Sequence, residues 1–159
     1  RSVTGVRRVL FRSIAMKKLL LTVGLPRSGK STWAKQQNIP IVNPDSIRLA
    51  LHGGRFLPEA EAMVWVMAKY MVKSLFLAGH DAVILDATNI TKQRRDEWKS
   101  KDWHRAFVMF DVSKDECLKR AQEDKDIIPI IEKMATEYEL LTVSEYSEKE
   151  YNFLHGIKV

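Results

Sequence analysis

GLPRSGKS at residues 24–31 matches the pattern G-x-x-x-x-G-K-[ST] in full. An apolar run at residues 19–23 precedes the motif and predicts a buried strand. Residues 31–37 follow it and predict the first turns of a helix. A chance glycine-containing turn is the simple alternative, but a complete motif placed between a strand and a helix argues against it. The sequence therefore predicts a phosphate-binding loop.

The residue types of the loop suit this chemistry. Glycine at positions 24 and 29 lets the backbone wrap closely and turn its N–H groups toward the phosphates of a nucleotide, assisted by the positive end of the helix dipole. We expect Lys30 to reach the β- and γ-phosphates and the Ser31 hydroxyl to bind the magnesium ion that bridges them. The residues expected to hold the nucleotide are Gly24, Pro26, Ser28, Gly29, Lys30, Ser31 and Thr32.

The first 15 residues carry most of the excess positive charge. They contain four arginines and no acid, so 22 basic and 20 acidic side chains remain in the rest of a chain whose net charge is +6. This distribution weakens the inference from basic charge to nucleic-acid binding. We expect residues 1–15 to be a non-native or disordered leader and residues 16–159 to be one domain of ordinary size. A basic arm that binds nucleic acid and an arginine-rich targeting peptide are the alternatives.

Several other features narrow the class of protein. The apolar run after Met16 is too short for a signal peptide, and no run of about eighteen apolar residues predicts a membrane span. The single cysteine, Cys117, cannot form an internal disulfide, which fits a cytoplasmic location. The four histidines lack metal-ligand spacing, so we expect magnesium and no structural zinc.

Apolar runs alternate with helical patterns along the chain. Apolar strands separated by helices are typical of a parallel sheet covered by helices on both faces. We therefore expect an α/β, three-layer sandwich with a five-stranded parallel sheet. The strands are predicted at residues 19–23, 39–42, 81–86, 105–112 and 151–159.

The predicted helices have recognisable ends. One begins at residues 45–48, and another at residues 58–79 shows an apolar stripe that we expect in the core. Asn89 or Thr91 is expected to cap the next helix, Ser113 the one after it, and Pro129 to stand in the first turn of the last. Residues 144–150 are acidic and are expected to form an exposed loop. The stripe comprises Met63, Met67, Tyr70, Met71, Ser74, Leu75 and Ala78. Trp98 and Trp103 are expected in the core rather than stacked on bases.

Two further segments fall with the phosphate loop at the carboxyl ends of strands, where ligands of such sheets bind. They are residues 45–48 and residues 86–89. Motor ATPases are usually larger, and a GTPase would need an N-K-x-D loop that this sequence lacks. Phosphoryl transfer to a hydroxyl acceptor is the class that remains.

Such a transfer needs a base for the acceptor proton, cations for the moving phosphoryl group and a lid that excludes water. Asp45 is placed to be the base, and Arg48 lies one helical turn later on the same face. Asp86 is a candidate ligand, through water, for the magnesium ion held by Ser31. The simpler roles are a helix cap for Asp45, a solvated side chain for Arg48 and a capping or hydrogen-bonding role for Asp86.

The motifs GLPRSGKSTWA, NPDSIR and LDATNITKQRR occur in this order, followed by a helix ending in CLKR, a polar segment, a proline and a helix with EYE. Together they resemble the kinase domain of phage polynucleotide 5′-hydroxyl kinases and their relatives among P-loop kinases. The resemblance covers about residues 16–141. It implies an adenylate-kinase-like P-loop NTPase fold with a short helical lid, and transfer of the γ-phosphate of ATP, with Mg²⁺, to the 5′-hydroxyl end of DNA or RNA.

The resemblance also implies roles for single residues. Lys30 and Ser31 would hold ATP and magnesium, and Asp45 would be the general base toward the 5′-hydroxyl. Arg48 would contact the phosphate next to the acceptor nucleotide. Arg120, at the start of the lid, would approach the nucleotide phosphates.

One departure keeps other acceptors open. The second lid arginine typical of the family is missing, because residues 121–126 read AQEDKD, and Lys125 cannot reproduce the bidentate contacts of an arginine. A phosphotransferase acting on a nucleoside, sugar or antibiotic hydroxyl is the alternative enzyme. A non-catalytic ATP-binding module is the alternative outside enzymes.

Overall fold

The computed structural model describes residues 17–54 and 56–146. The predicted leader at residues 1–15 and the predicted fifth strand at residues 151–159 lie outside the described residues. Four strands are present within the described part of the chain, rather than the five expected. They are β1 (Lys17–Val23), β2 (Ile41–Val42), β3 (Ala82–Leu85) and β4 (Trp103–Met109).

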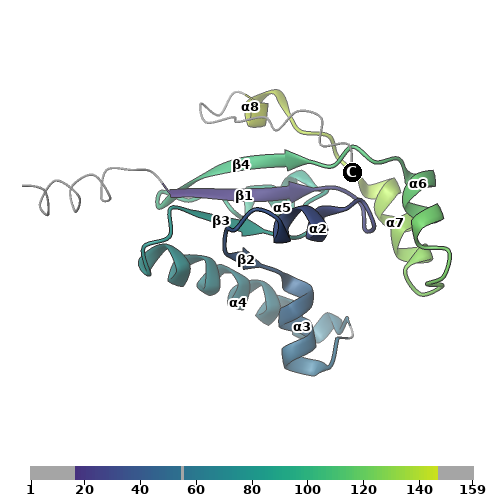
Figure 1. Ribbon diagram of the computed structural model, residues 1–159, viewed down its shortest axis with the longest axis horizontal. Helices are drawn as coiled ribbons and strands as arrows, with labels where there is room; N and C mark the ends of the chain where they lie inside the picture. The colour runs from purple at the N-terminus through teal and green to yellow at the C-terminus, as the bar shows by residue number, and fades with distance from the viewer. Residues whose placement is uncertain (1–16, 55, 147–159) are drawn as a thin grey trace, which may run out of the picture.

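The four strands form one parallel sheet with the order β2-β3-β1-β4. All strands therefore end at the same edge of the sheet, and Figure 1 shows this edge facing α6 and α7. The strand predicted at residues 105–112 runs instead from Trp103 to Met109, so it begins and ends earlier than expected. The sheet nevertheless has the predicted parallel architecture.

Helices pack on both faces of the sheet. The helices are α2 (Lys30–Lys35), α3 (Pro44–His52), α4 (Pro58–Leu77), α5 (Lys92–Asp96), α6 (Lys114–Arg120), α7 (Ile128–Glu137) and α8 (Val143–Tyr146).

The side chains of β1 alternate between two cores, as the period of a strand requires. Leu19 and Leu21 are fully buried in the larger core, which contains α4, Trp98 and Trp103. Leu20 packs in a smaller core with Trp33 of α2 on the other face. The three-layer arrangement and the core positions of the two tryptophans are thus as predicted.

The buried face of α4 matches the predicted stripe only in part. Met67 and Leu75 of the stripe pack against the core, but Met63, Tyr70 and Met71 are exposed. The buried positions are Val64, Ala68, Val72 and Phe76, at four-residue spacing. Apolar residues of α4 occur around most of its circumference, so the spacing of apolar residues alone does not identify the buried face. The smaller side chains of the observed face allow the helix to pack closely on the sheet.

The acidic segment predicted as an exposed loop at residues 144–150 begins differently in the structure. Its first residues belong to α8, and Glu145 is only 2% exposed. The carboxylate of Glu145 is buried because it binds the guanidinium of Arg95, with 2.7 Å between Oε2 and Nε. The prediction failed because the cation that accounts for burial of this acid lies fifty residues earlier. Residues 147–150 lie outside the described residues.

No helix among residues 17–54 and 56–146 has both the length and the apolar character needed to cross a membrane.

Candidate active site

The backbone of the phosphate loop takes two left-handed conformations. Arg27 has φ of 68° and Gly29 has φ of 94°. Such turns point backbone N–H groups inward and form an anion-binding hollow. Gly24 is required by packing, since a Cβ atom there would lie 2.7 Å from Ser28 Oγ and 2.9 Å from Phe110 Cβ. The predicted loop therefore has the backbone conformation that phosphate binding needs.

The other predicted nucleotide-binding residues lie around this loop. Gly29 is the N-cap of α2 and provides no side-chain hydrogen bond to its first turn. Ser31 and Thr32 follow in that turn and are exposed, whereas Pro26 is half-buried. The N–H groups at the start of α2 thus have no side-chain cap that would compete with a phosphate.

Lys30 is buried in the loop, with 8% of its surface exposed. Its Nζ donates hydrogen bonds to the carbonyl oxygen of Leu25 at 2.6 Å and to Ser28 Oγ at 3.3 Å. Burial lowers the pKa of Lys30 to about 8, an effect that the nearby carboxylate of Asp86 opposes. A phosphate oxygen would give this ammonium group a charged partner in place of the carbonyl.

Ser31 and Asp86, the two predicted metal ligands, lie in direct contact. Ser31 Oγ donates a hydrogen bond of 2.7 Å to Asp86 Oδ2. Asn43 Nδ2 donates to the same carboxylate oxygen at 2.9 Å. The loop after β3 therefore places a carboxylate at the start of α2.

The donor set at Ser31 and Asp86 fits Mg²⁺. The ion prefers hard oxygen ligands and usually takes one or two from the protein, with water and substrate phosphates as the others. Within residues 17–54 and 56–146, no group of three or more His, Cys, Asp or Glu side chains is arranged to hold a metal ion. A hydroxyl and one carboxylate beside a phosphate loop suit an ion that arrives with the nucleotide.

Asn43 joins the start of α3 to Asp86. Its Oδ1 accepts hydrogen bonds from the backbone N–H groups of Asp45 at 2.8 Å and Ser46 at 3.2 Å, so Asn43 is the N-cap of this helix. Asp45 is not the cap, and its side chain is 87% exposed. The simple capping role for Asp45 is therefore excluded, and its carboxylate is accessible.

Arg48 is bound by two carboxylates. One terminal nitrogen donates to Asp45 Oδ1 at 2.6 Å, while Nε and the other terminal nitrogen bind the two oxygens of Glu61, the former at 2.9 Å. The Arg48 side chain is 15% exposed, so it is not the solvated side chain of the simpler interpretation. The hydrogen bonds from Arg48 lower the pKa of Glu61, which keeps this partner ionised.

Asn43 and Glu61 were missed by sequence reasoning. Asn43 precedes a proline at the first helical position, which is a recognised signal for a helix N-cap. Glu61 has no comparable signal, because it reaches Arg48 only through the packing of α3 beside α4.

The helical hairpin α6–α7 lies beyond the carboxyl edge of the sheet, where a lid was predicted (Figure 1). Arg120, the last residue of α6, donates to the backbone carbonyl of Arg27 at 3.2 Å and to Glu116 Oε1 at 3.1 Å. Arg27 also pairs with Asp124, between the two helices, at 3.0 Å. The predicted lid arginine thus lies against the phosphate loop.

Hydrogen bonds connect the loop after β3 to β1 and to the phosphate loop. The carbonyl of Thr88 accepts from the backbone N–H of Gly24 at 3.0 Å, and Asn89 Nδ2 donates to the carbonyl of Thr22 at 2.8 Å. Arg95 binds the carbonyl of Asn89 at 3.1 Å from the other side. These bonds fix the segment that carries Asp86.

Comparison with known proteins places the chain among P-loop proteins. Residues 19–126 match a family described as AAA domain. A chain of the Pnkp1/Rnl/Hen1 RNA repair complex aligns at 26% identity with a TM-score of 0.65, covering 77% of this chain and 44% of that chain. The present chain thus spans less than half the length of that relative.

Two more distant structures share the fold. A sugar kinase from Janibacter sp. HTCC2649 aligns at 15% identity and TM-score 0.60, covering 82% of each chain. A fungal RNA kinase aligns at 14% identity and TM-score 0.56, covering 87% of this chain and 72% of that chain. The family match and the chain of the RNA repair complex confirm the predicted resemblance to a P-loop, polynucleotide kinase-like domain, and the two more distant structures share its fold.

Proposed function

The chain belongs to the AAA domain family, and we propose that it is an ATP-dependent kinase that transfers the γ-phosphate to the 5′-hydroxyl end of DNA or RNA. One observation carries this proposal: the accessible Asp45 carboxylate lies next to Arg48, and Asn43 connects the start of their helix to the Ser31–Asp86 contact. The residues proposed as base, anion-binding cation and nucleotide site therefore lie at one edge of the sheet.

The residues support an in-line transfer. Asp45 accepts the proton of the acceptor hydroxyl as that oxygen attacks the γ-phosphorus of ATP, and ADP departs. Lys30 and Arg120 offset the negative charge on the transferring group and the leaving phosphate. Ser31 and Asp86 would hold Mg²⁺, which would supply further charge neutralisation when bound. The α6–α7 hairpin excludes water, which would otherwise compete with the acceptor.

An exposed aromatic ring beside Arg48 favours a nucleotide acceptor. Phe56 is 64% exposed, and its ring centroid lies 5.9 Å from the guanidinium carbon of Arg48. A base stacks on such a ring, while the neighbouring arginine binds the phosphate attached to the same nucleotide. A sugar acceptor offers no aromatic face or phosphate to this pair.

A small-molecule hydroxyl is the second candidate, because the lid segment is acidic. Asp124 pairs with Arg27 at the phosphate loop, and Glu123 and Asp126 flank it. Like charges there oppose the approach of a long polyanion to the lid side of the site.

The test uses ATP labelled on its γ-phosphate and a panel of acceptors: 5′-hydroxyl DNA, 5′-hydroxyl RNA, 3′-nucleotides, nucleosides and sugars. We expect label in the nucleic acids. Label only in a small alcohol would establish the second candidate, and label in none of them would indicate a nucleotide-binding module.

Asp45→Asn tests the mechanism. We expect kcat to fall by about 10²–10⁴-fold, because the base is removed while the shape of the side chain is kept. Binding of ATP, measured by calorimetry, should remain. Transfer at the normal rate by this variant would show that Asp45 is not the base.

A further inference from the structure

Arg94 of α5 lies with its guanidinium over the ring of a tryptophan. Its guanidinium carbon lies 3.9 Å from the ring centroid of Trp65, and one terminal nitrogen donates to Glu97 at 2.7 Å. Among the described residues, the other guanidinium nitrogens of Arg94 have no hydrogen-bond partner, and the side chain is 33% exposed. A preoriented arginine thus retains donors that face solvent or a ligand.

This arginine lies close to the proposed acceptor site. Trp65 follows Glu61 by one turn of α4, and Trp65 and the charge of Arg94 add to the hydrogen bonds from Arg48 that lower the pKa of Glu61. Glu61 in turn holds Arg48. Arg48, Glu61, Trp65 and Arg94 therefore form a continuous row from the proposed base outward.

The spacing of this row suits successive phosphates. Glu61 and Trp65, which hold the two arginines, are separated by about 6 Å along the helix axis at 1.5 Å per residue. This separation is comparable to that between neighbouring phosphates of an extended single strand. α4 begins on the side of the sheet where the strands end (Figure 1), and Arg94 of α5 lies over Trp65 of this helix, so a strand entering the site can follow the row.

We propose that Arg94, oriented by Trp65, is a second phosphate contact that makes the site specific for a nucleic-acid strand with at least two phosphates. This inference rests on the proposed kinase function. Arginine suits the role because stacking fixes the plane of the guanidinium and so reduces the entropy lost when it binds a phosphate. Arg48 then reads the phosphate nearest the reacting hydroxyl, and Arg94 reads the next.

The test compares acceptors of different length with the full chain. Steady-state phosphorylation is measured with a 3′-mononucleotide, which carries one phosphate, and with a 5′-hydroxyl oligonucleotide of eight nucleotides. The enzymes are the wild type, Arg94→Ala, Arg94→Lys, Trp65→Phe and the matched control Lys73→Ala, which removes an exposed cation from α4.

We expect Arg94→Ala to raise KM for the oligonucleotide about tenfold without a change in kcat, since it removes a charge-assisted hydrogen bond. KM for the mononucleotide should stay within about twofold of wild type. The slope of log KM against log salt for the oligonucleotide should become shallower by about 0.7, as for the loss of one contact to a single strand. Arg94→Lys and Trp65→Phe should give intermediate values, and Lys73→Ala should match the wild type.

Three outcomes would overturn the inference. Equal rises in KM for both acceptors would mean that Arg94 affects the site as a whole, and no rise would mean that it does not touch the acceptor. In both cases the wild type still transfers phosphate, so the proposed function stands. Failure of the wild type to label either nucleic-acid acceptor would refute the proposed function together with this inference.

Discussion

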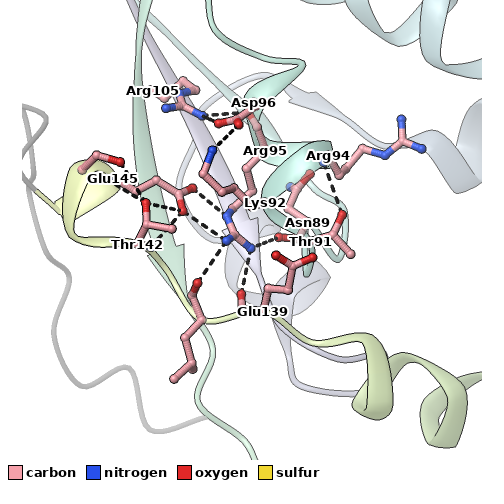
Figure 2. Close-up of polar contacts among 12 residues, drawn as sticks. Asn89, Thr91, Lys92, Arg94, Arg95, Asp96, Arg105, Glu139, Thr142 and Glu145 are labelled. Carbon is pink, nitrogen blue, oxygen red and sulfur yellow. Dashed lines mark hydrogen bonds and ion pairs between the residues drawn. The ribbon is translucent and has the colours of Figure 1, made fainter.

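Arg94 and Arg95 are consecutive residues of α5, and their side chains meet opposite environments. Arg95 is fully buried, and all five of its N–H donors are used: two by Glu145 and three by the backbone carbonyls of Asn89, Glu139 and Leu140. Arg94 extends away from this cluster, as Figure 2 shows, and its side chain donates one hydrogen bond among the described residues, to Glu97.

The difference separates a structural cation from one that can serve a ligand. A buried guanidinium is tolerated only when every donor and its charge are satisfied, and such a group has nothing left for a substrate. A half-exposed guanidinium that lies on an aromatic ring is held in one orientation, while most of its N–H donors remain available. The number of donors already engaged, rather than residue type, distinguishes the two arginines.

The largest expected effect is the loss of stability when Arg95, the buried arginine, is replaced. Arg95→Ala should lower the free energy of unfolding by about 3–5 kcal/mol, because it leaves the Glu145 carboxylate buried without its partner. Urea denaturation followed by circular dichroism measures the loss. Arg95→Lys, which keeps the charge but not the planar fork, should fall between Arg95→Ala and the wild type. A loss below about 1 kcal/mol would contradict the structural role.

The next effect concerns Lys30, a buried cation that still has a ligand to bind. Its pKa of about 8 means that raising the pH above 8 neutralises the ammonium in the free protein, while bound phosphates favour the charged form. The dissociation constant of ATP should therefore rise by up to about tenfold per pH unit above 8, equivalent to about 1.4 kcal/mol. Calorimetric titration between pH 7.5 and 9.5 tests this expectation. A constant affinity over this range would show that Lys30 does not meet the phosphates.

A smaller effect on stability is expected in acid. Burial raises the pKa of Glu145, but the hydrogen bonds from Arg95 and Thr142 outweigh it, so the pKa lies below its ordinary value of 4.5. The unfolded chain therefore binds the proton first, and the stabilisation that is present above pH 4.5 is lost as the pH falls below it. Unfolding of the wild type and of Glu145→Gln at pH 6 and pH 3.5 isolates this contribution. The gap between the two proteins should be narrower at pH 3.5, and an unchanged gap would be inconsistent with a depressed pKa.

The smallest expected effect is the change in stability when Arg94, the partly exposed arginine, is replaced. Arg94→Ala should change the free energy of unfolding by no more than about 1 kcal/mol, since the side chain is partly exposed and makes one ion pair and one cation–π contact, with Trp65. The same denaturation experiment provides the measurement, with Arg95→Ala as the matched neighbour. A loss comparable to that of Arg95→Ala would erase the distinction between the two arginines.

Local signals were sufficient for much of this molecule. The phosphate loop, the parallel strands β1 to β4 and the caps at Thr91 and Ser113 follow from short motifs and periodicity, and the structure contains them. These features depend on residues within a few positions of one another, where spacing determines which groups can meet.

The features that were missed depend on contacts between distant segments. Glu61 meets Arg48 across two helices, and Glu145 meets Arg95 across fifty residues. The core face of α4 was predicted only in part, because apolar side chains occur around most of the helix; Met67 and Leu75 pack against the core, but Met63, Tyr70 and Met71 do not. The roles of Lys30, Asp45, Arg48, Asp86 and Arg120 remain predictions, although the structure brings their side chains to one edge of the sheet.

Asn43 uses both ends of one amide. Its nitrogen donates to the Asp86 carboxylate, and its oxygen caps the helix that carries Asp45 and Arg48. A cation that binds Asp86 would compete with the side-chain N–H group of Asn43 for the carboxylate. Asn43 therefore connects the proposed nucleotide site to the helix that carries the proposed acceptor residues. Thermodynamic linkage then requires the effect to be reciprocal: if bound nucleotide changes the affinity for the acceptor, bound acceptor changes the affinity for nucleotide by the same factor. The two hydrogen bonds of Asn43 therefore predict cooperative binding of nucleotide and acceptor.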